Sequence, residues 1–258
     1  MRFNRILNYI YVIIIVVVLI GLVFIYLNKK GENFEEELKI IFKTKEEVQL
    51  FMINDKDDYF KNLSIYDLRA RNVGTNDEYK EVAIHSCLNF DKNQIEKLKR
   101  CCKEAIRYFR NGKDWKFALV SYKYEEGLPH TREDIIFISP AILNYDDMNL
   151  TKTLIHESIH IYQRYNRNNM DEYLIRNGFE RVRRRDKGTL VRSNPDLDDF
   201  IYRDKNGNEM VAIYNSEYPR GIGDVKLANS NMEHPFEYMA YEMAEGYYRS
   251  MISKYKEL

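Results

Sequence analysis

The longest uninterrupted apolar stretch of the chain lies at its amino terminus. Residues 6–28 contain no charged side chain, and residues 9–27 are apolar or aromatic almost throughout. Such a stretch can cross a bilayer of about 30 Å as a helix. A cleaved signal peptide is the alternative, but the apolar stretch exceeds the usual length of about 7–15 residues and no A-x-A-like cleavage site follows it. We therefore predict an uncleaved transmembrane anchor over residues 1–28, held in the lipid bilayer by residues 6–28.

Basic residues on the two sides of this span indicate its orientation. Arg2 and Arg5 precede the span, and five lysines follow it closely, at positions 29, 30, 39, 43 and 45. Because basic residues favour the cytoplasmic side, this count favours a cytoplasmic location for the rest of a single-pass membrane protein. Two glycosylation sequons, at Asn62 and Asn149, point the other way. Residues 29–45 are charged and contain a glycine, which is typical of a juxtamembrane stalk.

Beyond the stalk, the spacing of apolar positions alternates between helical and strand-like. Helical spacing and end signals predict helices over residues 91–110, 148–165, 171–182 and 235–255. Strand-like runs cover residues 116–124 and 134–139, and Asn206-Gly207 is a strong turn signal within a predicted hairpin over residues 200–214. No repeat and no Pro-rich or Gly/Ser-rich linker divides this part of the chain. Residues 46–258 are therefore predicted to form one α+β domain.

Charge and cysteine content exclude some classes of function. The chain has 40 Lys+Arg against 40 Asp+Glu, so there is no basic excess to predict nucleic-acid binding. The basic cluster at residues 181–185 is interpreted as a solvated helix end. Cys87, Cys101 and Cys102 are odd in number and two are adjacent, so a disulfide framework is not expected. The absence of Cys-x-x-Cys spacing disfavours a cysteine metal knuckle.

The chemically most informative segment is His156-Glu157-Ser158-Ile159-His160, which has the form H-E-x-x-H. It lies in an apolar run that predicts a buried helix. On that helix His160 lies only about 40° from His156, so both imidazoles can bind one Zn²⁺. Glu157 lies about 100° round the helix, beside the metal, where it can take a proton from an activated water. The segment therefore predicts a zinc site with Glu157 as general base.

A catalytic zinc needs a third protein ligand, and residues 161–170 contain neither glycine nor histidine to supply it in the H-x-x-G-x-x-H pattern. In the predicted helix that begins at Pro235, Glu237 lies about 60° from the centre of the apolar stripe, whereas Glu242 and Glu245 lie about 160° and 140° away. Because a buried carboxylate must be paired or bound to metal, Glu237 is the predicted ligand, with His234 as the alternative.

The combination of H-E-x-x-H with a glutamate on a downstream helix resembles the gluzincin branch of zinc metallopeptidases. More narrowly, several segments are similar to an uncharacterised family of metallopeptidase-like proteins encoded by large DNA viruses: residues 67–72, 128–131, 153–164, 194–196 and 234–244. The similarity covers about residues 64–245. It implies a single zincin-like domain with a small sheet, the ligands His156, His160 and Glu237, and a place in a virion or host-cell membrane. It supplies no substrate.

Other polar residues near these motifs are candidates for lesser roles. His130 and Tyr241 could contact substrate or stabilise an oxyanion, although His130 could equally be a turn residue and Tyr241 a packing residue. Asp196 could hydrogen-bond a ligating histidine. Together these features predict a membrane-anchored zinc peptidase acting on a peptide or protein substrate. The alternative is a catalytically inactive, structural zincin-like membrane protein, because ligand spacing alone does not separate structural from catalytic zinc.

Overall fold

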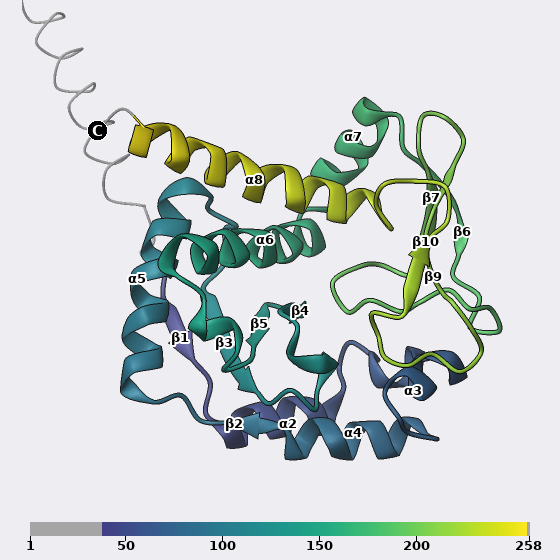
Figure 1. Cartoon of the computed structure of the whole chain (residues 1–258), viewed down its shortest axis with the longest axis horizontal. Coiled ribbons are helices and arrows are strands. Elements are labelled where there is room, and N and C mark those ends of the chain that lie inside the picture. Colours follow the sequence, from purple (N-terminus) through teal and green to yellow (C-terminus); the bar gives the residue numbers. More distant parts are fainter. Residues whose placement is uncertain (1–37, 257–258) are drawn as a thin grey trace, which may run out of the picture. The chain divides into compact units, whose positions relative to one another are not determined.

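The computed structural model describes residues 38–256, so the predicted anchor lies outside the part that can be described. Within residues 38–256, no helix is both long and apolar enough to cross a membrane. These residues form a mixed α+β unit, which confirms the predicted fold class (Figure 1). The unit begins at Lys39, earlier than the predicted boundary at residue 46. The reason is that Ile40–Phe42, assigned above to the stalk, pairs with the central strand of the main sheet.

The elements follow one another in an order that mixes helices and short strands. The α-helices are α2 (Lys45–Asn54), α3 (Ile65–Ala70), α4 (Asn76–His85), α5 (Lys92–Tyr108), α6 (Asp147–Tyr165), α7 (Arg167–Asn177) and α8 (Pro235–Lys256). The strands are β1 (Ile40–Phe42), β2 (Cys87–Leu88), β3 (Trp115–Val120), β4 (His130–Arg132), β5 (Ile135–Ile138), β6 (Glu180–Arg184), β7 (Phe200–Arg203), β8 (Glu209–Met210), β9 (Ala212–Tyr214) and β10 (Val225–Leu227).

The main sheet has the order β1-β3-β5-β4, and β2 also pairs with β3. Strands β1, β3 and β5 are parallel, whereas β4 is antiparallel to β5 and forms an edge. Side chains alternate along β3, so Phe117 and Leu119 join the core beneath α5, α6 and α8, and Ala118 and Val120 join the core beside α2 and α4. Because helices cover both faces, β3 and β5 are apolar almost throughout rather than alternating with polar residues.

Helix α6 lies between the sheet and α8, and its burial follows from its sequence. Leu150, Leu154, Ile155 and Ile159 are fully buried in the core beneath the helices. Asp146 begins the helix, because its side chain accepts a hydrogen bond from the backbone N–H of Asn149. The helices predicted over residues 91–110, 148–165 and 235–255 correspond to α5, α6 and α8, and each is confirmed to within two residues at each end.

The region after α6 differs from its prediction. The predicted helix over residues 171–182 is replaced by α7, which ends at Asn177, and by the strand β6. Gly178 causes this change, because it adopts φ +72°, a left-handed conformation that commonly ends a helix. The basic cluster at residues 181–185 therefore lies mainly on an exposed strand and is not a helix end.

The predicted hairpin over residues 200–214 is confirmed for its first part. Strands β7 and β8 form that hairpin around Gly207, and β6 pairs with the other edge of β7. Strand β9 departs from the prediction, because it pairs with β10. These two small sheets stand beside the amino-terminal end of α8 (Figure 1).

Candidate metal centre

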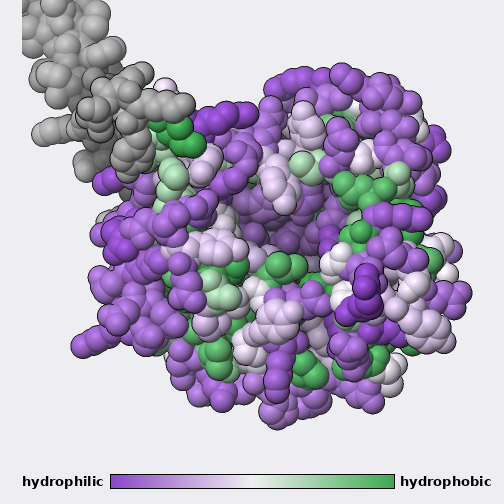
Figure 2. Space-filling view, viewed as in Figure 1, coloured by the Kyte–Doolittle hydropathy of each residue, from purple (hydrophilic) through white to green (hydrophobic). Residues whose placement is uncertain are grey.

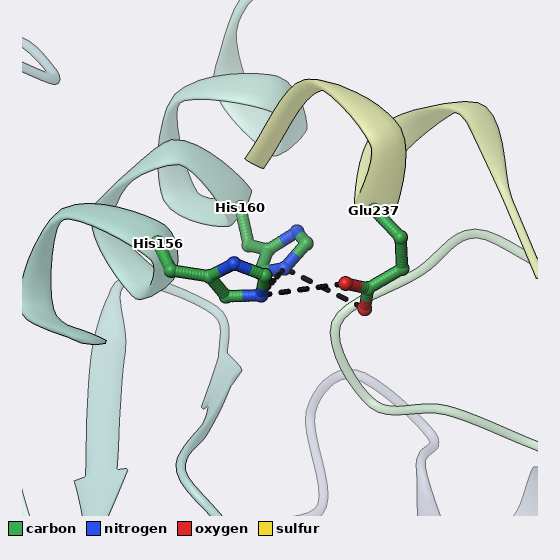
Figure 3. Close-up of side chains that lie close together, drawn as sticks. All are labelled: His156, His160 and Glu237. Atoms are coloured by element: carbon green, nitrogen blue, oxygen red, sulfur yellow. Dashed lines mark hydrogen bonds and ion pairs between the residues drawn. The ribbon is translucent and has the colours of Figure 1, made fainter. Parts of the chain in front are cut away.

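Helices α6 and α8 bring His156, His160 and Glu237 together, and the three side chains point toward one another (Figure 3). The Nε2 atom of His156 lies 3.1 Å from Nε2 of His160 and 3.3 Å from Oε2 of Glu237. The distance from His160 Nε2 to Glu237 Oε1 is 3.7 Å. Tetrahedral zinc with ligand distances of about 2.0–2.1 Å separates its ligand atoms by about 3.3 Å. This group can therefore hold a metal ion.

His160 is held in the form that a metal requires by a residue one turn further along α6. Its Nδ1 atom lies 2.9 Å from Oε1 of Gln163, whose Nε2 donates to the backbone carbonyl of Phe236 at 2.9 Å. A carbonyl only accepts, so the Gln163 amide is oriented with its oxygen toward His160. The proton of His160 is consequently on Nδ1, and the lone pair of Nε2 is directed to the other ligands.

Glu237 is oriented by the segment before β7. The side-chain amide of Asn194 donates to Glu237 Oε1 at 3.3 Å and to Glu233 Oε1 at 3.0 Å. Glu233 also pairs with Arg192. One oxygen of Glu237 is thus contacted by Asn194, while the other faces His156.

The protonation of the ligands fits a cation site. Burial lowers the pKa of His160, which favours the neutral imidazole that metals bind. Burial acts to raise the pKa of Glu237, but the adjacent His160 and His156 outweigh it and lower that pKa to about 2. The donor set is two imidazole nitrogens and one carboxylate, a combination found at catalytic zinc sites.

Glu157 is next to this group and lacks a partner of its own. The residue is 3% exposed, and its Oε2 atom has no hydrogen-bond partner in the part of the chain that the structure describes. Burial raises its pKa well above the usual range, and the carboxylates of Asp196 and Glu237 raise it further. A cation at the neighbouring ligands would oppose this shift. An unpaired buried carboxylate with a movable pKa is suited to carrying a proton.

The metal-binding group opens into a cleft of about 540 Å³ between the helices and the edge strand β4. In Figure 2 a hollow with hydrophilic surface in its depth lies near the centre of the face shown. Exposed apolar residues contribute to its lining, among them Leu128, Tyr145, Leu227 and Tyr241. The centre is therefore accessible from solvent on one side, unlike a metal enclosed by four protein ligands.

The two candidate contact residues both line this cleft. The Tyr241 ring lies 4.8 Å from that of His156, and burial raises the pKa of Tyr241, so its hydroxyl stays a donor. His130 is the first residue of β4, and its Nδ1 lies 3.0 Å from the Leu128 carbonyl. Nδ1 therefore carries the proton, which leaves Nε2 as an acceptor in the neutral ring. This geometry favours Tyr241 over His130 as an oxyanion donor.

The alternative ligand and the suggested histidine partner take other roles. His234 Nε2 lies 3.2 Å from Asp198 Oδ1, and its Nδ1 accepts from the Phe236 N–H, so it does not join the metal group. Asp196 hydrogen-bonds Thr131 rather than a ligating histidine. Sequence reasoning missed Gln163 and Asn194. The spacing of three residues after His160 could have indicated Gln163, since such positions are neighbours on a helix. Asn194 lies in one of the segments that carry the family resemblance, but its local pattern assigned it no role.

Comparison with known proteins adds no relative: no protein-family model, curated protein or solved structure matches the chain.

Proposed function

We propose that the protein is a membrane-anchored, zinc-dependent peptidase of gluzincin type. The observation that carries the proposal is the unpaired, buried carboxylate of Glu157 beside the three-residue group of His156, His160 and Glu237, at the floor of an open cleft. A structural zinc site is normally closed by four protein ligands and has no use for such a base. The same observation disfavours the alternative of an inactive structural protein.

In this proposal the two histidines and Glu237 hold the ion, with Gln163 and Asn194 fixing their orientation. Zinc bound there supplies a Lewis acid that polarises the scissile carbonyl and lowers the pKa of water. Glu157 takes one proton from the attacking water and delivers it to the leaving nitrogen as the C–N bond breaks. The other proton of the water is released as the new carboxylic acid ionises, so the products are a carboxylate and an amine. Tyr241 is placed to donate a hydrogen bond to the developing oxyanion.

Metal content by elemental analysis of the full-length chain tests the proposal. We expect one zinc per chain, lost in Glu237→Ala and retained in Glu157→Gln. Glu242→Ala is the matched control, because Glu242 is an exposed glutamate on the same helix. Peptide hydrolysis should be abolished in Glu157→Gln and Glu237→Ala but not in Glu242→Ala. Folded wild-type protein that binds no zinc, or zinc-loaded protein that cleaves no peptide in a diverse library, would contradict the proposal.

A further inference from the structure

Residues 193–196 line the cleft, and we call these four residues the strap. On the side of the helices, Asn194 donates to Glu237 of α8, and Arg164 of α6 donates to the carbonyl of Pro195 at 3.1 Å. On the side of the sheet, Asp196 Oδ1 accepts from both the N–H and the hydroxyl of Thr131 in β4. The strap is therefore fastened to both walls of the cleft, and we call the side of the cleft that it spans the closed end.

The edge of β4 is also closed to an incoming chain. An extended peptide can bind a sheet edge by pairing with its free N–H and C=O groups. Here the Thr131 N–H is already bonded to Asp196, and its carbonyl is contacted by Arg164. Pro129 lies two residues before Thr131, at the next position whose backbone would face an incoming chain, and proline has no N–H to donate. A peptide that extends out of the cleft at both ends would have to displace these contacts.

The closed end carries an anion with a free oxygen. Asp196 lines the cleft and uses Oδ1 for Thr131, while its Oδ2 has no hydrogen bond from any described residue. Arg192 and Arg164, two cations at this end, already bond protein groups. Arg192 pairs with Glu233 and donates to the Ile222 carbonyl, and Arg164 donates to Thr131 and to the carbonyls of Glu133 and Pro195. The unpartnered Nε of Arg192 is enclosed by protein atoms. An ammonium group therefore matches this end better than a carboxylate does.

We infer that the cleft takes the amino-terminal end of a peptide, with the α-ammonium group bound by Asp196 and a peptide bond close to that end at the metal centre. This inference rests on the proposed peptidase function. The reaction adds water across one amide bond, so that a short amino-terminal fragment leaves with a new carboxylate. The proton carried by Glu157 goes to the new amine of the remaining chain. The class of activity is thus an exopeptidase acting from the amino end.

The first test uses the zinc-loaded full-length protein and three forms of one decapeptide. One form has both termini free, one has an acetylated amino terminus, and one has an amidated carboxyl terminus. Mass spectrometry of the products should show successive loss from the amino end. Acetylation should slow the reaction at least about ten-fold, as expected when a hydrogen bond to a charged group is lost, whereas amidation should have no effect. Internal cleavage of the acetylated peptide at an equal rate, or loss of residues from the carboxyl end, would overturn the inference.

A second test uses Asp196→Asn, which keeps an oxygen to accept from Thr131 but removes the charge. KM for the free-amine peptide should rise at least about ten-fold with kcat changed less, because the lost interaction is with the ammonium group. Asp199→Asn is the matched control, since Asp199 is a partly exposed aspartate three residues away that pairs with Arg185. An unchanged KM in Asp196→Asn would contradict the assignment.

Binding separates the two hypotheses. Calorimetry on the zinc-loaded Glu157→Gln protein compares trialanine amide with its acetylated form, and needs no turnover. Tighter binding of the free amine supports the assignment of the amino-terminal end to Asp196 even where no peptide is hydrolysed, an outcome that would contradict the peptidase proposal and with it the exopeptidase activity. Equal binding of the two peptides overturns the inference whether or not the wild-type protein is a peptidase.

Discussion

Replacing Gln163 by methionine should weaken zinc binding beyond any effect on folding. Gln163 is 2% exposed and joins the two helices that carry the ligands. Its oxygen accepts from His160 Nδ1 at 2.9 Å, and its nitrogen donates to the carbonyl of Phe236 at 2.9 Å, one residue before Glu237. Methionine fills a similar volume but makes neither hydrogen bond. The substitution therefore removes the group that fixes the ring of His160 and the start of α8 together.

The magnitude follows from these two contacts. Each buried group left without a partner costs about 1–3 kcal/mol, so the metal-free variant should lose about 2–6 kcal/mol of unfolding free energy. Loss of the hydrogen-bond partner of a metal-bound histidine typically weakens metal affinity about 10- to 100-fold. That factor corresponds to about 1.4–2.8 kcal/mol of binding free energy.

The assay is competition for zinc between the protein and a chelating dye, with thermal unfolding of the metal-free protein measured in parallel. Gln49→Met is the matched control, because Gln49 also donates to a backbone carbonyl, that of Ile84 at 3.2 Å, but lies outside the cleft lining. It should lose stability without losing zinc affinity. If Gln163→Met binds zinc as tightly as the wild type, the assigned role of the amide in orienting His160 is refuted.

Three further substitutions test the surrounding structure. Burial opposes ionisation of Glu125, but the ion pair with Arg71 lowers the pKa of Glu125 to about 2. The pair therefore stabilises the fold above about pH 4.5. This contribution, of the order of 3 kcal/mol, is lost as the pH falls toward 2. Acid titration followed by circular dichroism should show a shallower pH dependence for Glu125→Gln and, because Arg71 is left unpaired, a lower stability at pH 7. Gly178→Ala should lower the unfolding free energy by about 1 kcal/mol in a urea titration, because φ is +72° there; no change would refute the helix-end role. Asp67→Ala should cost about 3–5 kcal/mol in the same titration, because buried Asp67 pairs with Arg185 and accepts from the Ser193 N–H; a cost below about 1 kcal/mol would contradict it.

The parts of the fold that were predictable are those with strong local periodicity. Helix α6 was predicted because its apolar residues recur at helical spacing. Glu237 was singled out because it is the glutamate of its helix that lies at the edge of the apolar stripe, and the structure places it beside His156. The error at residues 171–182 has a local cause as well, since Gly178 ends the helix and the residues that follow pair with β7.

The contacts around the ligands were not predictable, because they join residues distant in sequence. Thr131 meets Asp196 across 65 positions, and Asn194 meets Glu237 across 43. Nothing in the local pattern of residues 194–196 indicates which elements they will contact. The backbone of such a segment is placed by long-range contacts, here beginning with the bond from Ser193 to Asp67.

These same contacts couple access to the cleft with metal binding. Asn194 belongs to the strap and also donates to Glu237, so moving the strap away from the helices would remove a hydrogen bond from a residue of the candidate metal group. A bound cation that favours the observed orientation of Glu237 must therefore, by linkage, also favour the observed position of the strap. Bound zinc should make passage of a continuous chain through the cleft less favourable than in the metal-free protein. A peptide end that enters from the open side avoids this cost, which is why the closed end and the metal centre together favour an exopeptidase.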